Sequence, residues 1–202
     1  MREKPQTAGS AALVMVALLG VLWGVELLDQ LSGDRLDNLG IHARTVDGLA
    51  EIFAAPFLHA GWGHLVSNSV PFLVLGFLVL LGGLLRWVVS SLISIVSSGL
   101  AAWLLSPVNT VVIGASGLIF GWLTYLLARA IYSRKPGQVV VAMLVLLVYG
   151  SMIWGVLPGA AGISWQAHLG GAVGGVAAAR VLHRGAARGG QPASAREAAA
   201  RW

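Results

Sequence analysis

The stretch Gly114-Ala115-Ser116-Gly117 places one polar side chain between small residues inside a strongly apolar chain. It follows the loop sequence Pro107-Val108-Asn109-Thr110 and opens an apolar run that continues to Ala128. We therefore expect Ser116 in the first turn of a hydrophobic helix, where backbone N–H groups lack helical partners and can face an anion. This position suits a serine nucleophile, although a serine cap on a tightly packed helix would give the same pattern.

The composition around this stretch is that of a polytopic membrane protein. Of the 202 residues, 57% are hydrophobic and only 10% are charged, whereas a soluble domain carries about a quarter charged residues. The net charge of +5 comes from scattered loop and tail residues, so it does not indicate nucleic-acid binding. The chain has no cysteine, which excludes disulfides, cysteine nucleophiles and thiolate metal sites.

Carboxylates are confined to the two ends and to one early segment. They lie at Glu3, between Glu26 and Glu51, and at Glu197, so none occurs from residue 52 to 196. A zinc or calcium site in the membrane body would have to form without Asp or Glu, and no HExxH motif is present. Proton-coupled transport through a buried carboxylate is disfavoured for the same reason. We expect no metal and no other cofactor.

Six apolar stretches indicate membrane-spanning helices. They cover residues 11–28, 64–81, 87–105, 116–130, 139–157 and 166–182. The connection over residues 29–58 is much longer than an ordinary loop, so we expect it to be functional or folded in its own right. The sequence predicts a polar N-terminal tail over residues 1–10, one all-α six-span membrane domain over 11–182, and a disordered basic tail over 183–202.

The distribution of Lys and Arg predicts the orientation in the membrane. With six spans, all but two of the 13 basic residues lie on the side of both termini, the exceptions being Arg35 and Arg44. The positive-inside rule then places both termini in the cytoplasm. His64, Ser116 and His168 each lie at the start of an even-numbered span. They should therefore share one level just below the outer surface, where polar side chains are costly unless they have partners.

Spacing along the chain groups these residues further. Asn68 follows His64 by four residues, so both side chains project from one helix face. The spans that begin near Ser116 and His168 carry glycines at GxxxG spacing: Gly117 with Gly121, and Gly171 with Gly175. Close approach of these two helices would bring the Ser116 hydroxyl to the His168 imidazole. A Ser–His pair beside hydrogen-bond donors is an arrangement for acyl transfer.

Three motifs give the chain a resemblance to the rhomboid family of intramembrane serine proteases over residues 57–182. They are His59-x4-His64-x3-Asn68, Gly114-Ala115-Ser116-Gly117 and Ala167-His168-x2-Gly171-x3-Gly175, in the family's order. The resemblance implies a six-span bundle with a water-filled cavity that opens to the outside. It also implies that Ser116 is the nucleophile and His168 the general base.

The resemblance further implies roles for the residues around this pair. His64, Asn68 and the backbone N–H of Ser116 would form the oxyanion hole, and His59 would be a structural or water-organising residue. Because no carboxylate can complete a triad, packing must orient His168. Phe120, one turn after Ser116, can lie against the imidazole and replaces a tyrosine found in many family members. The supporting residues are His59, Gly114, Gly117, Phe120, Gly171 and Gly175.

The function implied by the resemblance is that of a serine endopeptidase that cleaves transmembrane segments near the outer face of a bacterial-type plasma membrane. Its partners would be single-span or multi-span membrane proteins and the lipid bilayer, without nucleic acid. The alternatives are a non-catalytic rhomboid-like scaffold that binds transmembrane helices and a small six-span transporter. Ser90, Ser94 and Ser98 could hold water or permit close helix packing. His42 and His183 are expected at solvated or interfacial positions.

Overall fold

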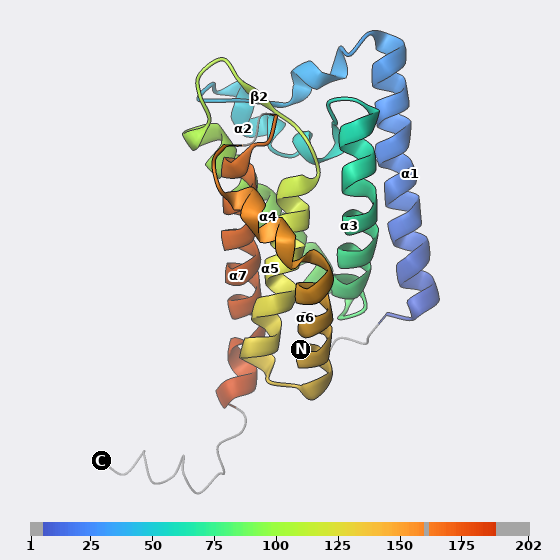
Figure 1. The fold of residues 1–202 in the computed structure, drawn as a ribbon, viewed down its shortest axis with the longest axis vertical. Helices are drawn as coiled ribbons and strands as arrows, with labels where there is room; N and C mark the ends of the chain where they lie inside the picture. Colours follow the sequence, from blue (N-terminus) through green and yellow to red (C-terminus); the bar gives the residue numbers. More distant parts are fainter. Residues whose placement is uncertain (1–5, 160–161, 189–202) are drawn as a thin grey trace, which may run out of the picture.

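The computed structural model describes residues 6–159 and 162–188, and within them six long helices form a bundle (Figure 1). These helices are α1 (Ala8–Ser32), α3 (Trp62–Leu80), α4 (Leu84–Leu105), α5 (Ser116–Ser133), α6 (Pro136–Tyr149) and α7 (Trp165–Arg188). The shorter elements are η1 (Leu36–Leu39), β1 (Ile41–His42), α2 (Asp47–Glu51), η2 (Ala55–Phe57), β2 (Val111–Val112) and η3 (Gly150–Val156). The described part of the chain is therefore mostly helical, as the composition predicts.

Four of the described helical segments are long and apolar enough to cross a membrane: Ala8–Ser32, Trp62–Leu80, Leu84–Leu105 and Pro136–Val156. For these four segments, length and apolar composition support the predicted membrane spans. The helix α5 has a physical reason to be less apolar, because it lies at the centre of the bundle and most of its side chains contact protein instead of lipid.

Both ends of the predicted membrane domain differ from the structure by a few residues. The first helix begins at Ala8, where the Thr7 side chain accepts a hydrogen bond from the Ser10 backbone N–H, so the N-terminal tail is shorter than predicted. The last helix continues beyond the predicted end at Leu182 to Arg188. Alanine and arginine in this stretch are strong helix formers. The remaining tail, residues 189–202, lies outside the described residues.

The predicted fifth span over residues 139–157 is two elements in the structure. The helix α6 ends at Tyr149, and the 3₁₀ segment η3 covers Gly150–Val156. Glycine weakens an α-helix because its backbone has many other conformations available. The break at Gly150 lets the chain turn back over α5 and α7, which matters for the site described below.

The core of the bundle is built around α5. Trp122, Tyr125 and Ile119 on this helix are fully buried. They belong to one hydrophobic cluster that also contains Met15 from α1 and Leu75 from α3. This central packing fixes the position of the first turn of α5, which carries Ser116.

The most extensive helix contact joins α5 and α7, and glycines make it possible. A Cβ atom added at Gly171 would overlap the carbonyl oxygen of Gly117, and one added at Gly175 would overlap that of Gly121. The two backbones therefore touch, which is the close approach that the GxxxG spacing predicts.

The serines of α4 fill the space above the glycines of α5. A Cβ atom added at Gly117 would overlap Ser98, and one added at Gly121 would overlap Ser94. The Ser98 hydroxyl also donates a hydrogen bond of 2.9 Å to the carbonyl oxygen of Ala167 on α7. These contacts favour close helix packing as the role of the serine stripe.

The long connection between α1 and α3 is folded, as predicted from its length. Its strand β1 pairs antiparallel with β2, with Ile41 opposite Val112. The backbone N–H of Gly114 donates a 2.9 Å hydrogen bond to the carbonyl oxygen of Ala55. The connection therefore holds the segment that leads directly into Ser116.

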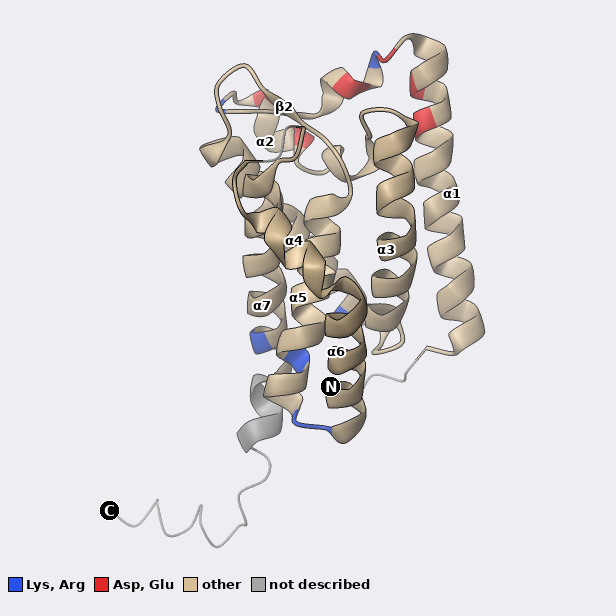
Figure 2. Ribbon diagram, viewed as in Figure 1, with Lys and Arg blue, Asp and Glu red and all other residues tan. Residues whose placement is uncertain are grey.

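Charges are separated along the bundle (Figure 2). Acidic residues lie at the end formed by the connection between α1 and α3, called the first connection below. Most basic residues lie at the opposite end. The basic residues outside the first connection whose side chains the structure describes are Arg86, Arg129, Arg134, Lys135 and Arg180. His183 near this basic end was predicted to be solvated or interfacial, and the solvated alternative is wrong. The imidazole is buried and lies 3.2 Å from the hydroxyl of Tyr125.

Candidate active site

Ser116 and His168 are hydrogen-bonded to each other. The Nε2 atom of His168 lies 2.8 Å from the Oγ atom of Ser116. Ser116 is the first residue of α5 and His168 lies in the first turn of α7, so the glycine contact between these helices brings the two side chains together. The first backbone N–H groups of α5 have no acceptor within the helix and are available to an anion beside Ser116.

The other ring nitrogen of His168 fixes the tautomer. Its Nδ1 atom lies 2.9 Å from the carbonyl oxygen of Gly155 in η3. A carbonyl oxygen only accepts hydrogen bonds, so Nδ1 carries the proton and Nε2 presents a lone pair to the Ser116 hydroxyl. The sequence did not point to Gly155, because every residue has a carbonyl group; a glycine within an apolar run was the only local signal.

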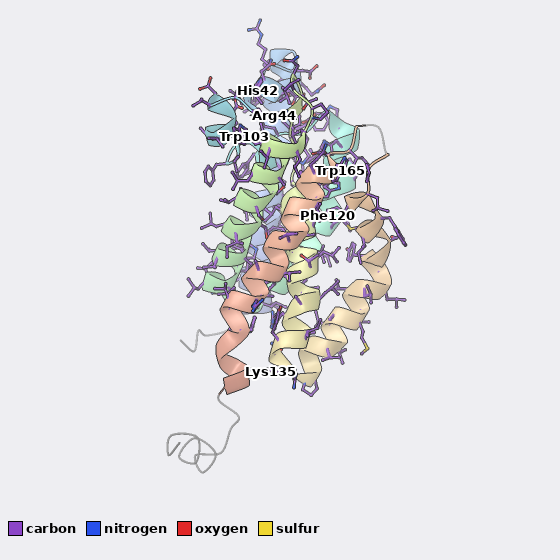
Figure 3. All side chains as sticks on the ribbon, turned by 90° about the vertical axis from the view of Figure 1, so that its left-hand side faces the viewer. His42, Arg44, Trp103, Phe120, Lys135 and Trp165 are labelled. Atoms are coloured by element: carbon purple, nitrogen blue, oxygen red, sulfur yellow. The ribbon has the colours of Figure 1, made fainter. Side chains whose placement is uncertain are left out.

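Phe120 holds the plane of the His168 ring. The two ring centroids are 4.1 Å apart and the rings are inclined by 12°, so they are stacked, as the spacing of Phe120 from Ser116 predicts. Gly155 packs against both rings: a Cβ atom there would lie 2.9 Å from Phe120 and 3.3 Å from Nδ1 of His168. Figure 3 shows Phe120 in the half of the bundle that also contains Trp165.

A cavity of about 220 Å³ connects this pair to the predicted oxyanion residues. His64 and Asn68 on α3 line it together with Ser116, Phe120 and His168. The structure therefore brings the polar residues of the three sequence motifs to one space, with His59 as the exception. Residues of η3 and of the segment before α7, such as Met152 and Ser164, complete the wall and were not predicted.

The hydrogen bonds of His64 and Asn68 leave donors for the cavity. The Nδ1 atom of His64 accepts a 3.3 Å hydrogen bond from the backbone N–H of Ala60, so its proton is on Nε2. The Nδ2 atom of Asn68 donates a 3.1 Å hydrogen bond to the carbonyl oxygen of His64 and has a second hydrogen to donate.

Gly114 provides room for the His64 ring. Its φ of +121° is a conformation that favours glycine, and a Cβ atom there would lie 2.6 Å from Cε1 of His64. Gly117, by contrast, faces α4 and α7 and supports the helix contact instead of the cavity.

His59 lies behind His64 and does not line the cavity. It is 1% exposed, and neither ring nitrogen has a hydrogen-bond partner among the described residues. The rings of His59 and His64 meet edge to face with centroids 5.1 Å apart. Burial, with a smaller effect of His64, lowers the pKa of His59 to about 4, so the ring is neutral near pH 7. This position suits a supporting role.

These observations describe a helical protein with membrane-spanning character in which a serine–histidine pair faces a partly open cavity. The family model of the rhomboid domain matches residues 47–185. The chain belongs to the rhomboid family, and it is an integral membrane protein.

Several proteins are similar in sequence to this chain, over most of its length or over part of it. An uncharacterized protein of Mycobacterium tuberculosis is 46% identical over 209 residues, which covers 95% of this chain and 86% of the relative. An uncharacterized protein of Mycobacterium leprae is 41% identical over 194 residues, covering 89% and 77%. Rhomboid-like protein 11 of the Arabidopsis thaliana chloroplast is 40% identical over 73 residues, covering 35% and 26%.

Proposed function

We propose that this protein is an intramembrane serine endopeptidase in which Ser116 is the nucleophile and His168 the general base. The observation that carries the proposal is the 2.8 Å hydrogen bond between Ser116 Oγ and His168 Nε2, which lies at a cavity shared with His64 and Asn68. Membership of the rhomboid family supports the same activity.

The tautomer of His168 suits this chemistry. As Ser116 Oγ attacks the scissile carbonyl carbon, its proton passes to Nε2, and the carbonyl of Gly155 accepts a stronger hydrogen bond from the now cationic ring. The imidazolium then gives the proton to the leaving amine, which frees the first product. A water molecule, deprotonated by the same nitrogen, hydrolyses the acyl-enzyme.

Negative charge on the tetrahedral intermediate would be bound by three donors. These are Nε2–H of His64, the second N–H of the Asn68 amide, and the backbone N–H of Ser116. The two side-chain donors are held by hydrogen bonds with backbone groups and the third belongs to the backbone, so little reorganisation is needed as charge develops.

The substrate is proposed to be a transmembrane segment of another membrane protein, cut near the outer face. All six long helices are proposed to cross the bilayer with both termini in the cytoplasm, which agrees with the separation of charges along the bundle. A helix must unwind locally to present a peptide carbonyl to Ser116. Glycine, proline or small residues near the cut should therefore favour cleavage.

Cleavage of a panel of single-span substrates by the purified protein in detergent tests the proposal. Ser116→Ala and His168→Ala should abolish cleavage, while Ser10→Ala, at an exposed position on α1, should cleave like the wild type. Asn68→Ala removes one oxyanion donor and should reduce the rate by ~10²-fold. Cleavage that persists in Ser116→Ala would overturn the proposal.

A fluorophosphonate probe separates a protease from a non-catalytic scaffold. The probe should label the wild type at Ser116 and leave Ser116→Ala unlabelled, because labelling requires an activated hydroxyl. A wild-type protein that stays unlabelled and uncleaving while it still binds transmembrane helices would be a scaffold.

A further inference from the structure

A second cavity lies at the end of the bundle opposite Ser116. It has a volume of about 380 Å³ and is bounded by the end of α3, the end of α5 and the start of α6. Figure 3 shows Lys135, which lines it, at the far end of the molecule from Phe120. The cavity is therefore separate from the candidate active site.

Two cationic side chains line this cavity. Arg129 on α5 is half-buried, and its Nε–H has no hydrogen-bond acceptor among the described residues. Its guanidinium lies over the turn after α3, where a Cβ atom at Gly82 would come within 2.7 Å of Nη1. Lys135 stands exposed at the mouth, just before α6. Arg86 binds the same turn through a 2.5 Å hydrogen bond to the carbonyl oxygen of Gly82.

These cations have no acidic partner in the described part of the chain. Residues 52–159 and 162–188 contain no Asp or Glu. The one ion pair found among the described residues, between His42 and Glu51, lies in the first connection, at the opposite end. Half-buried positive charge of this kind is stabilised by a bound anion.

The cavity continues into an apolar groove. A neighbouring cavity of about 180 Å³ lies between α3 and α6, and the two share Leu78 and Val141 as wall residues. The groove is otherwise lined by Val74, Leu144, Val145, Val148 and Tyr149. A charged pocket at the helix ends thus adjoins an open apolar groove between α3 and α6.

We propose that this composite site binds an anionic phospholipid of the leaflet at the basic end. The lipid phosphate lies against Arg129 and Lys135, and one acyl chain follows the groove past Leu78 and Val141. A free phosphate ion would interact with the two cations but would bury no acyl chain in the groove. A zwitterionic lipid would fill the groove but would bring its own cation close to Arg129 and Lys135. An anionic headgroup with an acyl chain matches both parts.

Binding of short-chain lipids to the purified full-length protein in mild detergent tests the proposal. Native mass spectrometry would count bound dioctanoyl phosphatidylglycerol and dioctanoyl phosphatidylcholine over a concentration series, with inorganic phosphate added as competitor. We expect one phosphatidylglycerol per chain, bound at least tenfold more tightly than phosphatidylcholine. Millimolar phosphate should not displace it.

Matched variants locate the site. The pair Arg129→Gln with Lys135→Gln should weaken phosphatidylglycerol binding at least tenfold. The pair Arg134→Gln with Arg180→Gln removes the same charge at the same end outside the cavity and should stay within twofold of wild type. Leu78→Trp fills the groove without changing charge and should also weaken binding at least tenfold.

Three results would overturn the proposal: equal binding of both lipids, equal losses in both charge-matched pairs, or displacement of the lipid by phosphate. If the Arg129→Gln pair fails to fold by size-exclusion chromatography, Leu78→Trp and Lys135→Gln alone decide. Binding unchanged in both would contradict the site.

Discussion

At the scale of single residues, the imidazole of His168 is held from three directions. Ser116 lies at one ring nitrogen, the Gly155 carbonyl at the other, and Phe120 on one face. In serine proteases with a triad a carboxylate holds the histidine. Here a neutral backbone carbonyl takes that position, so orientation depends on where η3 lies and not on an ion pair.

Gly155→Ala should therefore impair catalysis without unfolding the protein. The added methyl group would press on Phe120 and on Nδ1 of His168, and a displacement of about 1 Å can cost ~10²-fold in rate. The measurement is kcat on a single-span substrate, with thermal unfolding as the check of folding. Gly137→Ala, where an added Cβ atom meets nothing within 4 Å, is the control. Equal activity of the two variants would contradict the role of Gly155.

Much of this site could be predicted from the sequence, because its polar groups are side chains that occur at the spacing of recognisable motifs. Ser116, His168, His64 and Asn68 are polar residues in an apolar chain, and polarity at membrane depth is informative. The carbonyl of Gly155 could not be predicted, since a backbone group becomes specific only when the chain path is known.

Asp37 gives a prediction about pH. Burial, followed by repulsion from Asp29, raises the pKa of Asp37 from 3.8 to about 6. The folded protein then holds this proton more tightly than the unfolded chain, so this carboxyl costs stability as pH rises from about 4 to about 6. Asp37→Asn should raise the melting temperature at pH 7 and change it little at pH 4. Asp47→Asn, on the exposed side of α2, is the control; a gain independent of pH would contradict this account.

At the scale of elements, α7 carries two glycine faces. Gly171 and Gly175 contact the backbone of α5, while Gly170 and Gly174 contact α4, where added Cβ atoms would meet the chain near Ser97. One helix is thus fixed against two others at backbone distance. The first turn of α7, which carries His168, has little freedom to move relative to Ser116.

Gly175→Ala should destabilise the protein by about 1–3 kcal/mol or more, because the new methyl group overlaps a backbone carbonyl that cannot rotate away. The measurement is thermal or chemical unfolding in detergent. Gly24→Ala on α1, where nothing lies within 4 Å of the added Cβ atom, should be neutral or slightly stabilising. Equal stability of the two variants would argue against close packing of α5 and α7.

The helices were predictable as elements, with differences at their ends. Apolar runs located α1, α3, α4 and α5 within a few residues, since a membrane-spanning run is a strong signal. The break at Gly150 was missed because an apolar 3₁₀ segment has the same composition as an apolar helix. The pairing of β1 with β2 joins residues about 70 positions apart, and two-residue strands leave no pattern in the sequence.

At the scale of the whole molecule, charge separation defines two ends (Figure 2). The acidic residues and the candidate active site belong to the end with the first connection, and the basic cavity belongs to the other. The sequence predicted this polarity from the positive-inside rule, because the rule needs only the order of apolar runs and basic residues. Which helices enclose each cavity required the structure.

The absence of native cysteines allows a direct test of orientation. Single cysteines would be introduced at Asn38, in η1 at the acidic end, and at Gly137, at the basic end. A membrane-impermeant maleimide added to intact cells should label Asn38→Cys, whereas Gly137→Cys should be labelled only after lysis. The reverse pattern would place the termini outside and contradict the proposed topology.

The attachment of Gly114 to Ala55, together with the pairing of β1 and β2, has a practical meaning. The segment that leads into the proposed nucleophile Ser116 is anchored to the folded connection between α1 and α3. Under the proposed topology, a water-soluble antibody fragment or peptide that binds this connection would displace Ser116 from outside the bilayer. Inhibition of the proposed activity would then not require a hydrophobic molecule that competes with lipid.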